Sequence, residues 1–352
     1  MLAFIQFIGA VALLIIVHEL GHFLAAKAVG IRVHEFGIGF PPRLTRLFTA
    51  GGTEFTLNWI PLGGFVRPEG EQDQSVEGGY AESSPWARVF MLISGPAMNF
   101  LAALLLFAII FVRLGRPDLG TVTILDVSSN SPAAEAGLQP DDVILAIDGQ
   151  AIDSTQELRG LIYAKLGNPI EITYSRDGVT GAVKIVPRDP APAEGAIGIA
   201  MGNPLIPIKP PEALYYGGQA VLEQVNTLMT FPARILSGEV DSGKGRLVGY
   251  KGMYDIYTEV READADPQSA LPSGINTLAF FASISISLGL LNLLPVPALD
   301  GGRILFTLPE LLLRKRIPQS FENAVNLLGL ALLMLLVIYI NVQDFLNPVV
   351  LP

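Results

Sequence analysis

The sequence has no cysteine among its 352 residues. This absence excludes disulfide bonds, thiolate metal ligands and cysteine nucleophiles. Histidine is almost as scarce, because the chain has three, at His18, His22 and His34. Any metal site or acid–base chemistry must therefore be carried by these histidines and by carboxylates.

Charged residues are also few, at 16% of the chain against roughly 25% in an ordinary soluble protein. Half of the residues are hydrophobic, which disfavours a purely soluble enzyme. The formal net charge of −10 disfavours nucleic acid as a partner, because phosphate binding needs a basic surface. We therefore expect a lipid bilayer, and not nucleic acid, around much of the chain.

The apolar residues gather into four long runs, at residues 2–27, 89–112, 271–299 and 324–343. A helix rising 1.5 Å per residue needs about 20 residues to cross a hydrocarbon core of about 30 Å. The first run differs from a cleaved signal peptide because its basic residue, Lys27, follows the run and does not precede it. The sequence predicts a multi-pass α-helical membrane protein with four transmembrane helices and both termini on one side.

Lysine and arginine lie close behind the first and third runs, within residues 27–46 and 303–316. By the positive-inside rule, the first and third loops should face the cytoplasm. Both termini and the long second loop, residues 113–270, are then extracytoplasmic.

Within this loop, residues 120–202 alternate in the manner of short strands. The stretch from Ser131 to Gly149 resembles the bacterial PDZ domain. PDZ domains bind an extended peptide as an added strand at an open sheet edge. The late strand Gly198-Ile199-Ala200-Met201 is the expected edge for a peptide or a substrate ectodomain, although it could instead only complete the sheet.

We therefore divide the chain into four expected parts: residues 1–112 with two transmembrane helices, 113–203 as an α+β PDZ domain, 204–270 as an extracytoplasmic amphipathic helical linker, and 271–352 with the last two transmembrane helices.

The first run contains His18-Glu19-Leu20-Gly21-His22, which has the pattern H-E-x-x-H. Positions i and i+4 share one helix face, about 6 Å apart, so both imidazoles can bind one zinc ion. Glu19 is turned aside, where its carboxylate can accept a proton from water that the metal activates. A satisfied surface helix is the alternative. However, ionisable groups within hydrocarbon are costly and mark a functional site by default.

Catalytic zinc takes three protein ligands and keeps one position open. Without cysteine, the third ligand should be a carboxylate at membrane depth. Asp300 directly follows the third run, where Pro295 and Pro297 must break the helix. Capping of the next helix is the alternative role for Asp300. Asn292 could stabilise the oxyanion of the substrate, or form a hydrogen bond between helices.

H-E-x-x-H in the first run, together with Asn292-Leu-Leu-Pro-Val-Pro-Ala-Leu-Asp300-Gly, resembles the site-2 protease (M50) family of intramembrane zinc metalloproteases. The inserted PDZ unit makes the chain similar to the bacterial RseP-like branch of this family, although the chain has one PDZ unit where the best-known member has two. The resemblance covers nearly the whole chain, including Gly52–Phe55, Ile60–Val66 and Gly95–Asn99. It implies one zinc ion bound by His18, His22 and Asp300, with Glu19 as the general base, in a bacterial cytoplasmic (inner) membrane.

The resemblance further implies a membrane-associated β-hairpin in the first cytoplasmic loop, roughly Phe36–Val66, which holds the substrate in extended form. Phe55 and Leu57 are its expected substrate contacts. The implied activity is cleavage of transmembrane segments of single-span proteins in regulated intramembrane proteolysis. An anti-sigma factor already trimmed on its outer side and a remnant signal peptide are the implied substrates.

Two alternatives remain open at this point. One is a non-enzymatic membrane adaptor, in which the PDZ domain binds peptide and the metal is structural. A structural zinc normally has four protein ligands, which counts against it. The other is a metal transporter, for which internal repeats would be expected.

Overall fold

A computed structural model describes the chain except residues 72, 74, 240–246, 268, 270 and 349–352. The chain forms two compact units. The helical unit consists of residues 1–111 and 210–352, and the sheet unit consists of residues 112–209.

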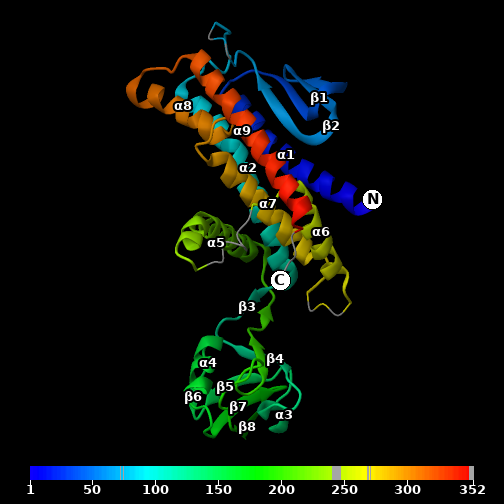
Figure 1. The fold of residues 1–352 in the computed structure, drawn as a ribbon, viewed down its shortest axis with the longest axis vertical. Helices are drawn as coiled ribbons and strands as arrows, with labels where there is room; N and C mark the ends of the chain where they lie inside the picture. The colour runs from blue at the N-terminus through cyan, green and yellow to red at the C-terminus, as the bar shows by residue number, and fades with distance from the viewer. Residues whose placement is uncertain (72, 74, 240–246, 268, 270, 349–352) are drawn as a thin grey trace. The chain divides into compact units, whose positions relative to one another are not determined.

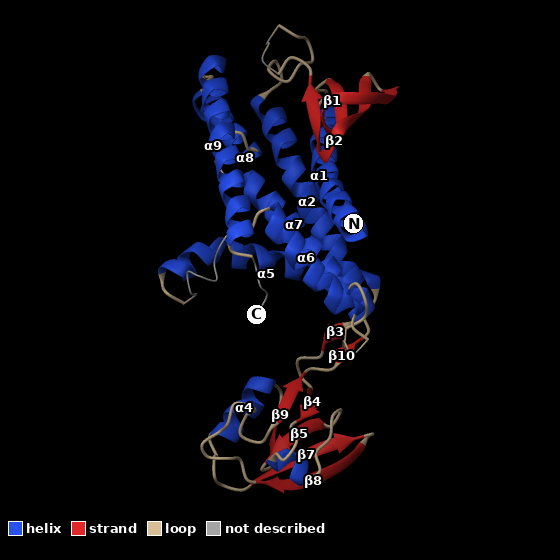
Figure 2. Ribbon diagram, turned by 45° about the vertical axis from the view of Figure 1, so that its right-hand side comes forward, coloured by secondary structure: helices blue, strands red, loops and turns tan. Residues whose placement is uncertain are grey.

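Four helices of the helical unit are long and apolar enough to cross a membrane: α1 (Leu2–Ala28), α2 (Pro85–Leu114), α7 (Ile275–Leu293) and α9 (Gln319–Leu346). They include most of each predicted apolar run and extend side by side (Figures 1 and 2). Helix α7 ends two residues before Pro295, as the proline required. A shorter helix, α8 (Asp300–Leu313), follows it.

The segment expected to be an amphipathic helical linker, residues 204–270, is helical over much of its described length. It contains two further helices, α5 (Pro210–Leu236) and α6 (Tyr250–Ala265), and both belong to the helical unit. The apolar stripe of α5 packs on the long helices, where Val221 is buried with Ala103 and Ile286. Helix α6 packs on α1, where Tyr257 meets Phe7. Both helices thus pack on the long helices of the same unit.

The predicted hairpin is present as β1 (Val33–Ala50) and β2 (Thr53–Pro68), which pair in antiparallel register. Its strands fold back on each other through several register shifts. As a result, Phe36 pairs with Phe55 on one side and with Val66 on the other. The segment around Phe55 is therefore an inner strand, whereas the segment 64–68 lies at an edge.

The sheet unit has a main sheet in the order β8-β7-β5-β4-β9, to which β6 is attached beside β5. Its strands are β4 (Val122–Val127), β5 (Val143–Ile147), β6 (Gln150–Ala151), β7 (Ile170–Arg176), β8 (Val179–Ile185) and β9 (Ile199–Gly202). Two helices complete it, α3 (Pro132–Glu135) and α4 (Thr155–Tyr163). A separate pair is formed by β3 (Arg116–Pro117) and β10 (Leu205–Ile206).

Local sequence signals explain the short helices of this unit. The Ser131 hydroxyl accepts a hydrogen bond from the Ala134 N–H at the start of α3. Ser154 caps α4 in the same way, through the N–H of Glu157. Leu158 of α4 is fully buried in the core of the unit.

Candidate metal centre

His18 and His22 lie on the face of α1 that is buried in the helical unit. Buried residues recur along this helix at Phe7, Val11, Leu14, His18 and then Gly21, His22 and Ala25, which is the spacing of one helix face. Both histidines are buried, with 7% of their surface exposed. Their Nε2 atoms lie 3.1 Å apart.

Asp300 is the first residue of α8, and it reaches the histidines because the chain turns sharply after α7. Pro295 and Pro297 end the preceding helix. A Cβ on Gly301 would overlap the carbonyl of Leu293, and one on Gly302 would overlap that of Val296. Only glycine therefore lets α8 begin directly against the end of α7.

The loop before Asp300 has one strained residue. Ala298 has a φ of +73°, a left-handed conformation that costs a non-glycine residue about 1–2 kcal/mol. Contacts around the loop must offset this cost.

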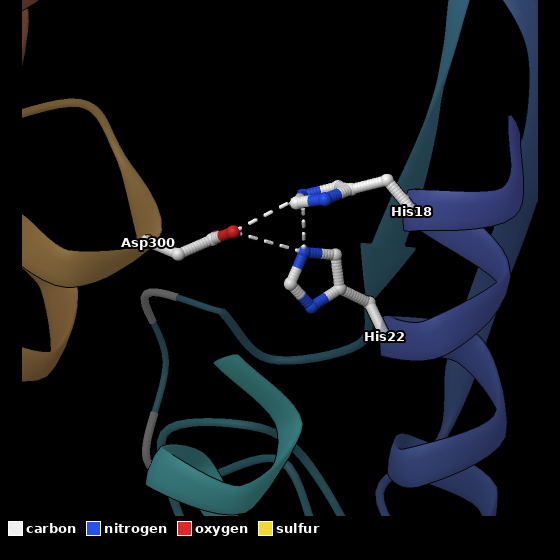
Figure 3. Close-up of side chains that lie close together, drawn as sticks. All are labelled: His18, His22 and Asp300. Atoms are coloured by element: carbon white, nitrogen blue, oxygen red, sulfur yellow. Dashed lines mark hydrogen bonds and ion pairs between the residues drawn. The ribbon is translucent and has the colours of Figure 1, made fainter. Parts of the chain in front are cut away.

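The three predicted ligands meet at one point (Figure 3). Asp300 Oδ2 lies 3.1 Å from His18 Nε2 and 3.2 Å from His22 Nε2. Zinc bonds of about 2.0–2.1 Å in a tetrahedron place ligand atoms roughly 3.3 Å apart. The spacing of the three ligand atoms is thus close to that of three corners of a zinc tetrahedron, and two histidines with one carboxylate are a ligand set found at catalytic zinc.

The outer nitrogen of His22 supports the same interpretation. Its Nδ1 lies 2.8 Å from the carbonyl oxygen of Met91, and a carbonyl can only accept, so Nδ1–H donates. The proton is therefore on Nδ1, and the lone pair of Nε2 faces His18 and Asp300. This is the usual arrangement of a metal-binding histidine and its outer hydrogen bond.

Asn99 of α2 is a site residue to which the sequence interpretation assigned no role. It is fully buried, and its amide lies 3.1 Å from His18 Nδ1. With Nδ2 in that place, Oδ1 has no partner. If the Nε2 of His18 binds a metal, its Nδ1 carries the proton and needs an acceptor. Exchanging the positions of the oxygen and nitrogen in the Asn99 amide places Oδ1 where it can accept this hydrogen bond. The feature of the sequence that could have indicated this role is that Asn99 is a polar residue within the apolar run 89–112.

Close contact between α1 and α2 leaves no room for side chains beside the ligands. A Cβ on Gly95 would overlap the ring of His22, and a Cβ on Gly21 would overlap the Ser94 carbonyl. Small residues allow such helices to approach closely. Gly95 therefore provides the space in which the two imidazoles converge.

Glu19 is partly buried beside the ligands, and the group of potential metal ligands formed by His18, His22 and Asp300 does not include it. The N–H of Val66 donates to its carboxylate, and the position of a Cβ on Gly64 would be 3.5 Å from Glu19 Cγ. The edge segment of β2 therefore borders the predicted base. The third histidine, His34, is exposed on β1.

The remaining predicted residues of the helical unit are placed differently. Nδ2 of Asn292 donates to the Leu288 carbonyl in its own helix, so one amide N–H is already used. Phe55 stacks on Phe48 and lies on the inner strand of the hairpin, as does Leu57, which pairs with Ile38 and Thr45. Their backbones therefore have no free side at which an added strand could pair.

In the sheet unit, the predicted strand Gly198–Met201 corresponds to β9. It pairs with β4 and ends the main sheet. A groove of about 250 Å³ runs beside it, lined by Ile162 and Tyr163 of α4 and by Gly198, Ile199 and Met201. This edge position and groove are those expected for strand addition.

Comparison with known proteins gives a family. Residues 6–336 match peptidase family M50. A Clostridium perfringens protein that carries a zinc-metalloprotease name is 34% identical over 345 residues, with 97% of both chains covered. Metalloprotease MmpA of Caulobacter vibrioides is 29% identical over 366 residues, covering 94% of this chain and 92% of that protein.

Among solved structures, the PDZ domain of an SdrC-like protein from Listeria monocytogenes is 31% identical, covers 23% of this chain and 85% of that chain, and has a TM-score of 0.21.

The family match extends over both segments that carry the clustered ligands, the start of the chain with His18 and His22 and the late segment with Asp300. It also extends over helices apolar enough to cross a membrane. The chain belongs to peptidase family M50 and is a membrane zinc metallopeptidase.

Proposed function

We propose that this metallopeptidase is an intramembrane endopeptidase that cuts the transmembrane segments of single-span membrane proteins. The observation that carries the proposal is the position of His18 and His22 inside α1, a 27-residue helix apolar enough to span a bilayer. Asp300 completes the cluster from a second segment of the same unit. A peptide bond hydrolysed at this point would lie at membrane depth.

Bound zinc would be held by His18, His22 and Asp300, and it supplies a Lewis acid that activates water and polarises the scissile carbonyl. Glu19 would take the proton of the attacking water and pass it to the leaving amine. Its place beside the ligands, outside the ligand group, suits this role. Asn292 has a second amide N–H that would stabilise the oxyanion.

The edge segment Gly64–Val66 would hold the substrate. A helical peptide bond is shielded and must be unwound before it is cut, and an unwound segment needs partners for its backbone. The edge of β2 lies next to Glu19, so a substrate strand paired there would pass the base. In this proposal the substrate pairs with residues 64–66, and Phe55 and Leu57 support the hairpin from its inner strand.

For topology we propose a bacterial cytoplasmic membrane, with both termini and the sheet unit extracytoplasmic and the hairpin associated with the membrane from the cytoplasmic side. The basic residues within 27–46 and 303–316 support this orientation. The activity would then serve regulated intramembrane proteolysis, for example of a pre-trimmed anti-sigma factor or a remnant signal peptide.

The sheet unit would act as a PDZ domain that binds a peptide or a substrate ectodomain along β9. The edge position of Gly198, Ile199, Ala200 and Met201 and the groove beside α4 support this part of the proposal.

The alternative adaptor function requires a structural metal, for which four protein ligands are usual. In the part of the chain that the structure describes, the cluster offers three. This donor set favours the peptidase.

The test is a Glu19→Gln variant in proteoliposomes with a tagged single-span substrate. It should bind one zinc per chain and leave the substrate intact, because the amide cannot accept the proton. Glu262→Gln changes an exposed glutamate of α6 and should cleave at the native rate. Cleavage by the Glu19 variant at the native rate would contradict the proposed mechanism.

A further inference from the structure

Helix α9 supplies no residue to the ligand cluster of the described chain, yet it touches the loop that leads into the ligand Asp300. Most of its side chains are exposed and apolar, and the described buried residues of the helix are Gly329 and Asp344. Asp344 accepts hydrogen bonds from the N–H groups of Gly249 and Gly252 at the start of α6. Gly329 lies against the loop before Asp300.

Two contacts join α9 to this loop. The position of a Cβ on Gly329 would be 2.5 Å from Pro297 Cβ and 2.8 Å from the Pro297 carbonyl oxygen, so Pro297 rests directly on the helix backbone. Asn326 Oδ1 accepts a hydrogen bond of 3.1 Å from the N–H of Ala298. Residues 326 and 329 are three apart and share one helix face. Together they form what we call the α9 seat.

The loop needs an external support for its shape. Ala298 holds a left-handed backbone conformation with φ +73°, which L-residues disfavour. Leu299, which precedes α8, gives that helix no side-chain cap. The N–H of Ala298 finds its acceptor on α9, two residues before Asp300. A change in this loop would therefore move the Asp300 carboxylate relative to the histidines.

We propose that Asn326 and Gly329 are positioning residues that hold Asp300 in place as a metal ligand. The inference rests on the proposed role of His18, His22 and Asp300 in metal binding. It makes the fourth long helix necessary for tight zinc binding although that helix contributes no ligand.

The experiment measures zinc affinity of the full chain in detergent by competition with a chelator, together with the visible absorption of the cobalt-substituted protein. Asn326→Leu removes the acceptor, and Gly329→Ala places a methyl group against Pro297. Both should weaken zinc binding about tenfold to a hundredfold, as losses of outer-shell support do. Both should also change the cobalt spectrum, which reports ligand geometry.

Three variants serve as controls. Asn326→Asp keeps the oxygen acceptor and should retain native affinity and the native cobalt spectrum. Asn323→Leu changes an exposed asparagine one turn earlier on α9, whose oxygen accepts from the Gln319 side chain. Gly9→Ala adds a methyl group to α1 at a point with nothing within 4 Å. The last two should also bind zinc like the native chain.

The proposal is overturned if Asn326→Leu and Gly329→Ala bind zinc as tightly as the native chain, or if Asn326→Asp loses as much affinity as Asn326→Leu. A separate comparison tests the underlying site. If Asp300→Ala binds zinc as tightly as the native chain, the ligand set itself is wrong, and the seat has no ligand to position.

Discussion

At the scale of single residues, the side-chain amide of Asn99 depends on the tautomer of His18. The two groups lie 3.1 Å apart, and Asn99 is fully buried, so water cannot replace a lost partner. If Nε2 binds the metal, Nδ1 carries a proton and needs an acceptor. The amide oxygen of Asn99 is then that acceptor.

A pair of variants tests this assignment. Asn99→Asp keeps an oxygen acceptor of the same reach and should retain zinc affinity within about threefold, whereas Asn99→Leu should weaken it about tenfold to a hundredfold. Chelator competition measures both. Equal losses in the two variants would mean that the amide nitrogen, and not the oxygen, faces His18.

The histidine pair was predictable because i and i+4 positions of one helix are local neighbours. Asp300 was predictable by elimination, since cysteine is absent and a third ligand was needed. Asn99 and Gly329 carry no such local pattern. Their roles depend on contacts between distant segments. Asn99 contacts His18, 81 residues earlier in the chain, and Gly329 contacts Pro297, 32 residues earlier.

At the scale of elements, an ion pair joins the residue before β5 to the end of β7 in the sheet unit, and its acidic partner is buried. Asp142 has a fully buried side chain. Its carboxylate accepts from Arg176 Nε at 2.7 Å and Nη2 at 2.8 Å, and from the N–H of Gln139 at 2.8 Å. Burial raises the pKa of Asp142, but the bonds to Arg176 and Gln139 outweigh it, so the pKa lies below its ordinary value.

A lowered pKa in the folded state predicts the pH dependence of stability. The contribution of Asp142 is complete above the unfolded pKa of about 3.9 and is lost as the pH falls through the lower folded value. Asp142→Asn should reduce the free energy of unfolding of the sheet unit by about 2 kcal/mol at pH 7. The difference from the native chain should shrink below about pH 4.

Hydrogen exchange of β5 and β7 in the full chain measures this difference at each pH. Asp141→Asn alters the exposed neighbour and should leave protection unchanged. A difference between native and Asp142→Asn protection that stays constant down to pH 2 would show that the carboxylate charge is not the cause.

The elements also differ in how well the sequence predicted them. The four long helices can be predicted from the length of the apolar runs alone, because a run of about 20 apolar residues is typical of a membrane-spanning helix. Helix α6 was not predicted, since its described buried residues are only Gly252, Tyr257 and Asp264 and form no long apolar stripe. The hairpin was expected, but its register shifts, which make Phe55 an inner residue, depend on the folded strands.

At the scale of the whole molecule, zinc should be required for activity but not for the helical fold. Two of the ligands lie on the long apolar helix α1, and the third begins α8 after a loop held by other contacts, so the helices can form without the ion. Chelation in detergent should abolish cleavage and leave the far-ultraviolet circular dichroism unchanged. Added zinc should restore cleavage to the native chain but not to Asp300→Ala at the same concentration.

Cleavage that persists after complete removal of the metal would contradict assignment of the reaction to the His18, His22 and Asp300 cluster. Loss of helical signal on chelation would instead mean that the ion holds the helices together, which is the behaviour of a structural site.

The membrane class, the two histidines with their glutamate, and the need for a carboxylate ligand can all be derived from the amino-acid sequence. These depend on composition and on neighbours within one helix turn, which act before any distant segments meet. The groups that surround the ligands follow only from the folded chain. Folding brought Asp300 to His18, which lies 282 residues away in the sequence. It also placed Asn99 within hydrogen-bond distance of His18 and packed the loop before Asp300 against α9. Such contacts arise only when helices distant in sequence pack together, and no local pattern encodes them.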